Sequence, residues 1–121
     1  MTFEADLFTL LKGASVALGT RVFPDFAPVN TTRPYVTYQA IGGRVLNPLS
    51  NDSPGRRNAE IQVNVWSNTR AEALSISRAI EDAMRAATQF EARPIGAAVS
   101  DYDAEIPVYG SRQDFSCWHT T

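Results

Sequence analysis

The chain has 121 residues, of which 44% are hydrophobic and 20% charged, and its formal net charge at pH 7 is −2. This length is sufficient for one domain with its own core, and the composition is that of a globular protein rather than a disordered one. The small negative charge gives no general reason to expect binding to nucleic acid or to an anionic membrane. The single cysteine, Cys117, has no internal disulfide partner, and no signal-like or membrane-spanning apolar run is found. We therefore expect one soluble, intracellular domain over residues 1–121.

Two segments have the spacing of amphipathic helices. Residues 3–18 carry apolar side chains at intervals of three and four, after Thr2 as a capping residue. Residues 70–87 follow Thr69, and Glu72 three positions later completes a capping-box pattern. The apolar face of this second segment contains Ala73, Ile76, Ile80, Ala83, Met84 and Ala87. The sequence predicts helices over both segments.

Other segments have the composition or the alternation of strands. Residues 35–41 are rich in tyrosine, valine and threonine, and residues 60–65 alternate strictly between polar and apolar side chains. Further strands are predicted over 96–102 and 108–118, whereas 21–26 is a short extended piece. These elements predict an α+β fold, in which a mainly antiparallel sheet of about four to five strands carries both helices on one face.

A long polar excursion separates two of these strands. Residues 44–57 consist mostly of turn-forming Asn, Pro, Ser, Asp and Gly, and they include Arg44, Arg56 and Arg57. A loop of this length in a small domain is usually functional or disordered, so we expect a mobile arm. The arginines are too few to predict a nucleic-acid site by themselves.

The last third of the chain is acidic on balance and contains alternating carboxylates at Asp101, Asp103 and Glu105. Two interpretations of the charge distribution remain open. The first is chance variation in a short chain. The second is a contact in which the basic arm of one copy meets Asp101, Asp103 and Glu105 of the next, a head-to-tail arrangement that can close into a ring. The same carboxylates could bind a divalent metal, but they lack the glycine turn and distant glutamate of a calcium loop, so a solvated turn is favoured.

No set of residues predicts catalysis. Cys117 and His119 share one face of a strand, but a Cys–His nucleophile also needs an orienting group. Ser111 and Asp114 have only His119 available as a base. The sequence contains no nucleophile elbow, phosphate-binding loop or Cys-x-x-Cys pair. We predict that the protein is not an enzyme and has no catalytic residue, no metal and no cofactor.

Several segments, taken in order, resemble one known family. They read LFTLLKGA, VFPDFAP, RPYVTYQAIGG, AEIQVNVWSNTRAEALSISRAIEDAM and YDAEIPVYGSRQDFSCWH. In order and spacing they are similar to the small tail-completion, or tail-terminator, proteins of long-tailed phages and prophages. The similarity extends over nearly the whole chain, although each motif alone is weak.

The resemblance implies a function in assembly. It implies an α+β protomer that joins a hexameric ring at the head-proximal end of the tail tube, ends tube polymerisation and joins the tail to the head. The implied partners are other copies of the chain, the tail-tube protein and the head–tail connector protein, with DNA passing through the ring. Such a protein is expected in the virion tail after assembly in the bacterial host cytoplasm. The alternative is a tail-assembly chaperone or binding module that is not retained in the particle.

Overall fold

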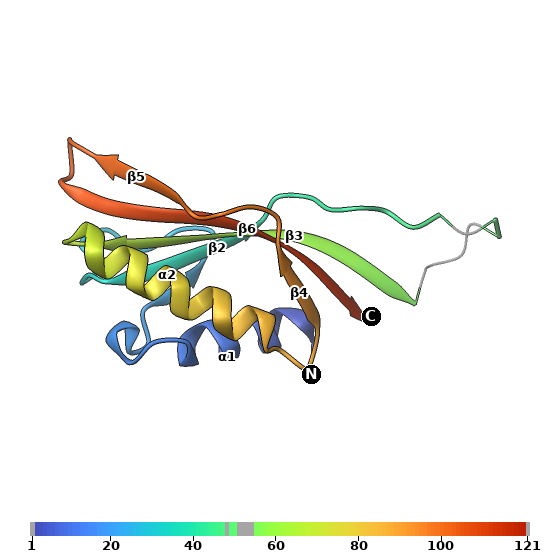
Figure 1. Ribbon diagram of the computed structural model, residues 1–121. Helices are drawn as coiled ribbons and strands as arrows, with labels where there is room; N and C mark the ends of the chain where they lie inside the picture. Colours follow the sequence, from blue (N-terminus) through green and yellow to red (C-terminus); the bar gives the residue numbers. More distant parts are fainter. Residues whose placement is uncertain (1, 48, 51–54, 121) are drawn as a thin grey trace.

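The computed structural model describes residues 2–47, 49–50 and 55–120. One long six-stranded sheet forms the first layer, and two helices, α1 (Phe3–Gly13) and α2 (Arg70–Arg85), lie on one face of it (Figure 1). The strands are β1 (Val22–Pro24), β2 (Tyr35–Ala40), β3 (Arg56–Ser67), β4 (Glu91–Pro94), β5 (Val99–Asp103) and β6 (Val108–Thr120). The predicted α+β fold with both helices on one face is confirmed. The predicted number of strands is too low, because β1 was expected only as an extended piece and β4 was not predicted.

The long pair β3–β6 forms the centre of the sheet. The strand order is β1-β2-β3-β6-β4, and β5 also pairs with β6. All pairs are antiparallel except β1 with β2, so the sheet is largely antiparallel, as predicted. Because β3 occupies one edge of β6 over its whole length, β4 and β5 share the other edge. There, β4 pairs with residues 115–118 and β5 with residues 108–112.

The core lies between the sheet and the helices. Ile61, Val63 and Val65 of β3 face the helices, and Phe115 of β6 is fully buried beside them. This alternation leaves the opposite face of the sheet without a helix. None of the described helices is both long and apolar enough to cross a membrane.

The start of α2 follows the prediction with one change. Thr69 is the N-cap, and its Oγ1 accepts a hydrogen bond from the Glu72 backbone N–H at 3.1 Å. The Glu72 carboxylate accepts a hydrogen bond from the Ser67 hydroxyl instead of reaching back to the Thr69 N–H. The Thr69 N–H donates to Ser67 Oγ at 3.3 Å. A serine thus completes the capping arrangement at the junction of β3 and α2.

Both helices are shorter than predicted. α1 ends at Gly13 rather than at residue 18, because Ser15 adopts an extended conformation with φ −147° and ψ 133°. Residues Val16–Leu18 then form a separate 3₁₀ turn. This turn places the Leu18 side chain in the core, where it is fully buried. α2 ends at Arg85, two residues before the predicted boundary.

Candidate assembly surfaces at the two ends of the sheet

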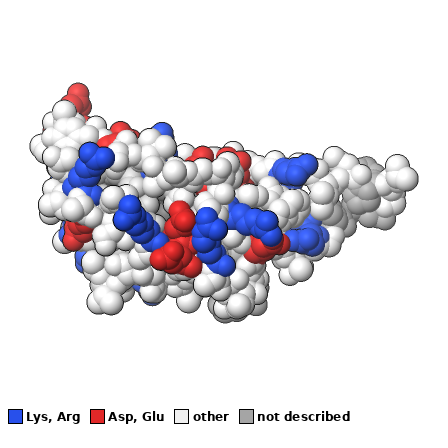
Figure 2. Space-filling model, in the orientation of Figure 1, with Lys and Arg blue, Asp and Glu red and all other residues white. Residues whose placement is uncertain are grey.

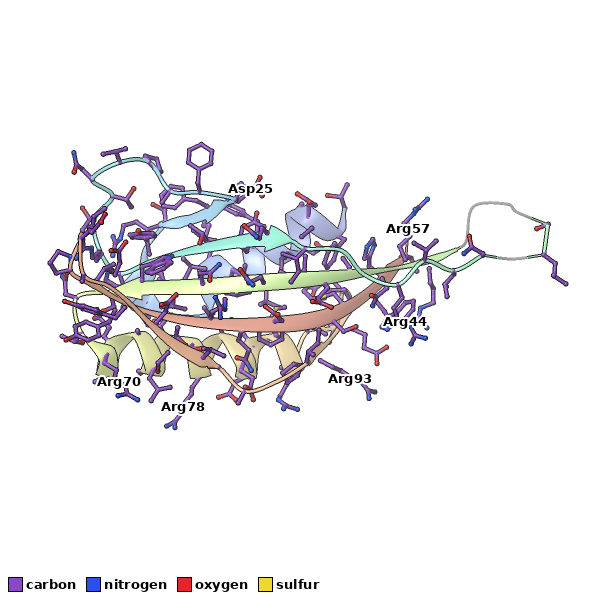
Figure 3. All side chains as sticks on the ribbon, turned by 90° about the horizontal axis from the view of Figure 1, so that it is seen from above. Asp25, Arg44, Arg57, Arg70, Arg78 and Arg93 are labelled. Atoms are coloured by element: carbon purple, nitrogen blue, oxygen red, sulfur yellow. The ribbon has the colours of Figure 1, made fainter. Side chains whose placement is uncertain are left out.

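The segment that follows β2 forms an arm whose root lies along β3 (Figures 1 and 3). Residues 41–42 exchange two backbone hydrogen bonds with Glu60, each 2.8 Å long. Gly43 has φ 146° and lies so close to β3 that a Cβ atom there would be 2.5 Å from the Asn58 carbonyl oxygen. The Arg44 N–H donates to Asn58 Oδ1 at 2.9 Å. Backbone contacts therefore fix the direction in which the arm leaves the sheet.

The arm exposes apolar side chains beyond this root. Val45 is 78% exposed, Leu46 is 42% exposed and Leu49 is fully exposed. No hydrogen bond joins residues 45–47 to any other residue that the structure describes. The arm is predicted to be mobile, and part of that prediction falls on residues 48 and 51–54, which lie outside the described residues. An apolar segment that projects from a small domain is typical of a surface that a partner covers.

The predicted end of the arm at residue 57 is wrong, because Arg56 and Arg57 are the first residues of β3. They pair with Thr120 and His119 of β6, so the ladder extends further toward the arm than the polar sequence indicates. Figure 3 shows Arg44 and Arg57 pointing to opposite sides of the arm root.

Arg56 already has partners within its own protomer. Its Nη2 lies 3.4 Å from Glu91 Oε2, and its guanidinium carbon lies 5.2 Å from the centre of the Trp118 ring. Glu91 also pairs with Arg93 at 3.1 Å. All three charged groups are substantially exposed, so these pairs contribute little to stability and could rearrange in a contact.

The predicted acidic residues lie in and after β5, where the chain turns into β6. Asp101 Oδ1 accepts a hydrogen bond from the Tyr102 N–H at 2.9 Å, and Asp103 Oδ1 accepts one from the Glu105 N–H at 3.0 Å. Asp103 therefore shapes the turn that follows β5, whereas the Asp101 bond lies within the strand. In the described part of the chain, none of the three forms an ion pair with a lysine or arginine. This end, which we call the acidic hairpin (residues 99–109), has negative charge without a local partner.

The acidic hairpin also has apolar surface and a hollow. Tyr102 and Tyr109 lie with ring centres 4.8 Å apart, and both are exposed, as is Ile106. Residues 101–105 line a pocket of about 370 Å³ together with Trp66, which lies on the helix-free face of the sheet. The hairpin thus combines charge with aromatic groups, which are enriched in protein interfaces.

Arg33, for which the sequence predicts no functional role, connects the acidic hairpin to the body. Its Nη1 donates to the Pro107 carbonyl oxygen at 2.8 Å and to Asn68 Oδ1 at 3.1 Å. It thereby joins three connections at one end of the sheet: the residues before β2, the β3–α2 turn and the hairpin turn. Only the charge of Arg33 is visible in the sequence, and nothing there indicates this role.

The arm and the acidic hairpin lie at opposite ends of the protomer (Figure 1). The β3–β6 ladder runs from Arg56 opposite Thr120 at the arm to Ser67 opposite Tyr109 at the hairpin. At about 3.3 Å per residue, this separation is roughly 35 Å. The predicted basic and acidic groups therefore do not meet within one protomer.

The remaining charges form no patch of a single sign on the face shown in Figure 2, where basic and acidic groups alternate along α2 and β4. Glu81 illustrates the pattern, since it pairs with Arg85 at 3.1 Å. Its carboxylate also accepts a hydrogen bond from the Gln113 side chain at 2.7 Å. These two hydrogen bonds lower the pKa of Glu81, the one from Gln113 being the larger cause.

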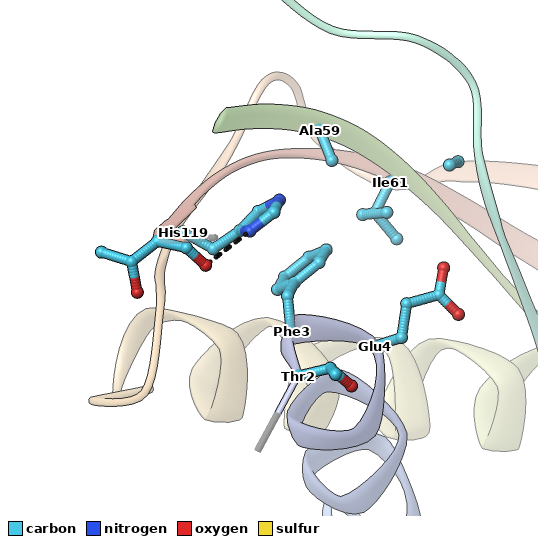
Figure 4. Close-up of a pocket in the computed structure, with 8 residues that line it drawn as sticks. Thr2, Phe3, Glu4, Ala59, Ile61 and His119 are labelled. Atoms are coloured by element: carbon cyan, nitrogen blue, oxygen red, sulfur yellow. Dashed lines mark hydrogen bonds between the residues drawn. The ribbon is translucent and has the colours of Figure 1, made fainter. Parts of the chain in front are cut away.

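An apolar pocket of about 400 Å³ lies between the N-terminus of α1 and the arm end of the sheet (Figure 4). The Phe3 ring stacks on the His119 ring, with centres 4.2 Å apart and planes 2° apart, beneath Ala59 and Ile61. Phe3 also meets Phe90 edge-on at 5.1 Å. His119 is thus packed against an aromatic ring, which the sequence did not predict.

The groups considered for catalysis do not form a reactive arrangement. Cys117 is fully buried, and burial raises the pKa of its thiol to about 12, which opposes formation of the thiolate. Ser111 and His119 are eight positions apart along β6, opposite Val65 and Arg57, so they cannot share a proton. Among the described residues, no group of three or more His, Cys, Asp or Glu could hold a metal ion.

The fold is that of an α+β protomer with exposed charged and apolar groups at both ends of its sheet. Residues 5–120 match the model of a protein family described as tail completion protein gp17. The chain belongs to this family and is therefore a structural protein of a phage-type tail.

Comparison with solved structures agrees on the fold. The chain is similar to a chain in the virion of a native gene transfer agent particle, with a TM-score of 0.67 and 17% sequence identity. The match covers 98% of this chain and 95% of the other. No curated protein matches the chain in sequence.

Proposed function

We propose that this protein forms a hexameric ring at the head-proximal end of the tail tube. There it ends tube polymerisation and joins the tail to the head connector. Assembly takes place in the bacterial host cytoplasm, and residues 1–121 act as one domain without a catalytic role. Its partners are other copies of itself, the tail-tube protein and the connector, and DNA passes through the ring without sequence-specific contacts.

The observation that carries the proposal is the position of the two candidate surfaces at opposite ends of one continuous sheet. A surface at one end that fits a different surface at the other end is heterologous, and repetition of such a contact gives a closed ring when the rotation allows. A self-complementary dimer would instead need one patch that matches itself. Membership of the tail completion family supports the location of this ring at the end of a tail.

The proposed interface consists of Arg44, Arg56 and Arg57 on one copy and Asp101, Asp103 and Glu105 on the next. Exposed ion pairs contribute only about 0.2–1 kcal/mol each and are screened by salt. We therefore expect these charges to set the register and orientation of the contact more than its strength.

Charge reversal tests this interface. Arg56→Glu with Arg57→Glu, and separately Arg44→Glu, should lower the fraction of protein in rings at low salt without changing the circular dichroism spectrum. Arg78→Glu is the matched control, because Arg78 lies on the exposed side of α2 and forms no ion pair with any described residue. Mass measurement of the protein alone and with the tail-tube protein reports ring formation. Unchanged assembly of the arm variants at low salt would contradict the proposed charge contact.

Electron microscopy of particles made without this protein tests the role itself. Overlong tails or tails without heads are expected if the ring ends polymerisation and joins the head. An absence of tails would instead indicate an assembly chaperone that is not retained in the particle.

A further inference from the structure

The outer edge of β5 is an open sheet edge. β5 pairs with β6 on one side, and no described strand pairs with the other side. All five residues of β5 are exposed, although the strand belongs to the central sheet of the protein. An open edge offers backbone N–H and C=O groups to any extended segment that fits it.

The acidic side chains of β5 restrict which segment can fit. If two copies of β5 paired with each other, Asp101 and Asp103 of one copy would lie close to the same carboxylates of the other. Like charges opposite each other on neighbouring strands are destabilising. Repulsion between these carboxylates therefore disfavours pairing of β5 with β5 of another copy. It favours pairing with an extended segment that carries positive charge.

The arm provides such a segment. Residues 44–47 read Arg-Val-Leu-Asn, with no proline or glycine, and they follow a root that already runs along β3 in strand-like pairing. Only the Arg44 N–H is bonded, to Asn58 Oδ1, and residues 45–47 make no hydrogen bond to other described residues. The segment combines exposed apolar side chains and one arginine with a backbone that, over residues 45–47, bonds to no described residue.

We propose that residues 44–47 of one copy add as a strand to the open edge of β5 of the next copy. This inference rests on the proposed ring and specifies how neighbouring protomers are joined, by a shared sheet and not by charge alone. Main-chain hydrogen bonds supply affinity in such strand additions, and alternate side chains supply specificity.

The side chains fit this arrangement. In a strand, Arg44 and Leu46 point to one side and Val45 to the other. In the strand register Asp101 lies opposite Gly110, which lies opposite Trp66, so Asp101 and Asp103 are on the Trp66 side. Tyr102 lies opposite Tyr109 and is therefore on the side of the helices. Charge and apolar groups are both matched when Arg44 and Leu46 lie on the carboxylate and Trp66 side, and Val45 lies beside Tyr102.

A disulfide test probes this contact directly. One chain carries Val45→Cys with Tyr102→Cys, and a second carries Val45→Cys with Ser100→Cys to cover the neighbouring register on the same side of β5. Directly opposite side chains in paired strands have Cβ atoms about 4.5–5.5 Å apart, close enough for a disulfide after small shifts. The native Cys117 is fully buried and does not compete. The control is Val16→Cys with Tyr102→Cys, because Val16 is 99% exposed but lies outside the arm.

We expect the arm variants, assembled with the tail-tube protein and mildly oxidised, to give covalent multimers up to the ring size on a non-reducing gel. The control should remain monomeric on the same gel. Rings that form normally without crosslinks above the control level in either arm variant would overturn the strand addition while leaving the proposed function intact. If no rings form even with the unmodified protein, both proposals are wrong.

A proline scan separates backbone pairing from charge. Val45→Pro and Leu46→Pro each remove one N–H donor, and successive N–H groups point to opposite sides of a strand, so at least one variant must lose an intermolecular bond. We expect the more affected variant to assemble about tenfold more weakly, which corresponds to one lost backbone hydrogen bond and some strain. Val45→Ala and Leu46→Ala are the controls. Equal assembly of the proline and alanine variants would contradict the pairing.

Discussion

The middle of the sheet and its two ends bury very different fractions of their apolar side chains. In the middle, Ile61, Val63 and Phe115 are at most 3% exposed and belong to one core cluster that includes residues of both helices. At the ends, Val45 is 78% exposed and Ile106 is 60% exposed. The middle is complete within one chain, whereas the ends leave exposed apolar groups and an open strand edge, and the carboxylates of the acidic hairpin form no ion pair with described residues. From this difference we expect stability and assembly to depend on separate parts of the molecule.

Truncation of large apolar side chains gives the strongest test of this separation. Phe115→Ala should lower the free energy of unfolding by about 3–5 kcal/mol, because it leaves a cavity in the core. Leu49→Ala should change this free energy by less than about 0.5 kcal/mol, since Leu49 is fully exposed on the arm. Urea unfolding followed by circular dichroism measures both. Comparable losses for the two variants would show that the arm is part of the stable body.

The arm root, where the two regions meet, should give a smaller effect. Gly43→Ala places a Cβ atom against the Asn58 carbonyl at a positive φ, and such strain costs about 1–3 kcal/mol. We expect faster hydrogen exchange of the Ile41 and Glu60 amides and weaker ring formation. Gly13→Ala is the control, because nothing lies within 4 Å of its added Cβ atom. Normal exchange at the root of the Gly43→Ala variant would show that this glycine does not hold the arm.

The parts predictable from the sequence are those set by local pattern. α2 was predictable because its apolar spacing and its Thr69 cap agree, and the buried alternation of β3 was equally clear. β1 and β4 were not, because strands of three and four residues depend on the neighbours that pair with them. The polar start of β3 has the composition of a loop, and its extended conformation depends on pairing with the end of β6.

The candidate site, too, is only partly predictable from the sequence. The charges of the arm and the acidic hairpin were visible in the sequence, but their location at opposite ends follows from the direction of the β3–β6 ladder. The open edge of β5 was not predictable either, because only the sheet order shows which strand lacks a neighbour. Composition can suggest that two segments attract each other, whereas topology decides whether they belong to one protomer or to two.

Substitution of Arg33 should have a small effect on stability and tests the attachment of the acidic hairpin. Arg33 connects this hairpin to the body through Pro107 and Asn68. Arg33→Ala should lower the free energy of unfolding by only about 1 kcal/mol, since its two hydrogen bonds lie near the surface. It should nevertheless weaken ring formation, because the hairpin that presents Asp101 and Asp103 loses its attachment. Arg33→Lys is the control that keeps the charge but cannot reproduce the planar guanidinium geometry at both acceptors. If Arg33→Lys assembles like the unmodified protein while Arg33→Ala does not, charge at this position is sufficient. If both variants assemble normally, the hairpin needs no fixed position and the arm adapts to it.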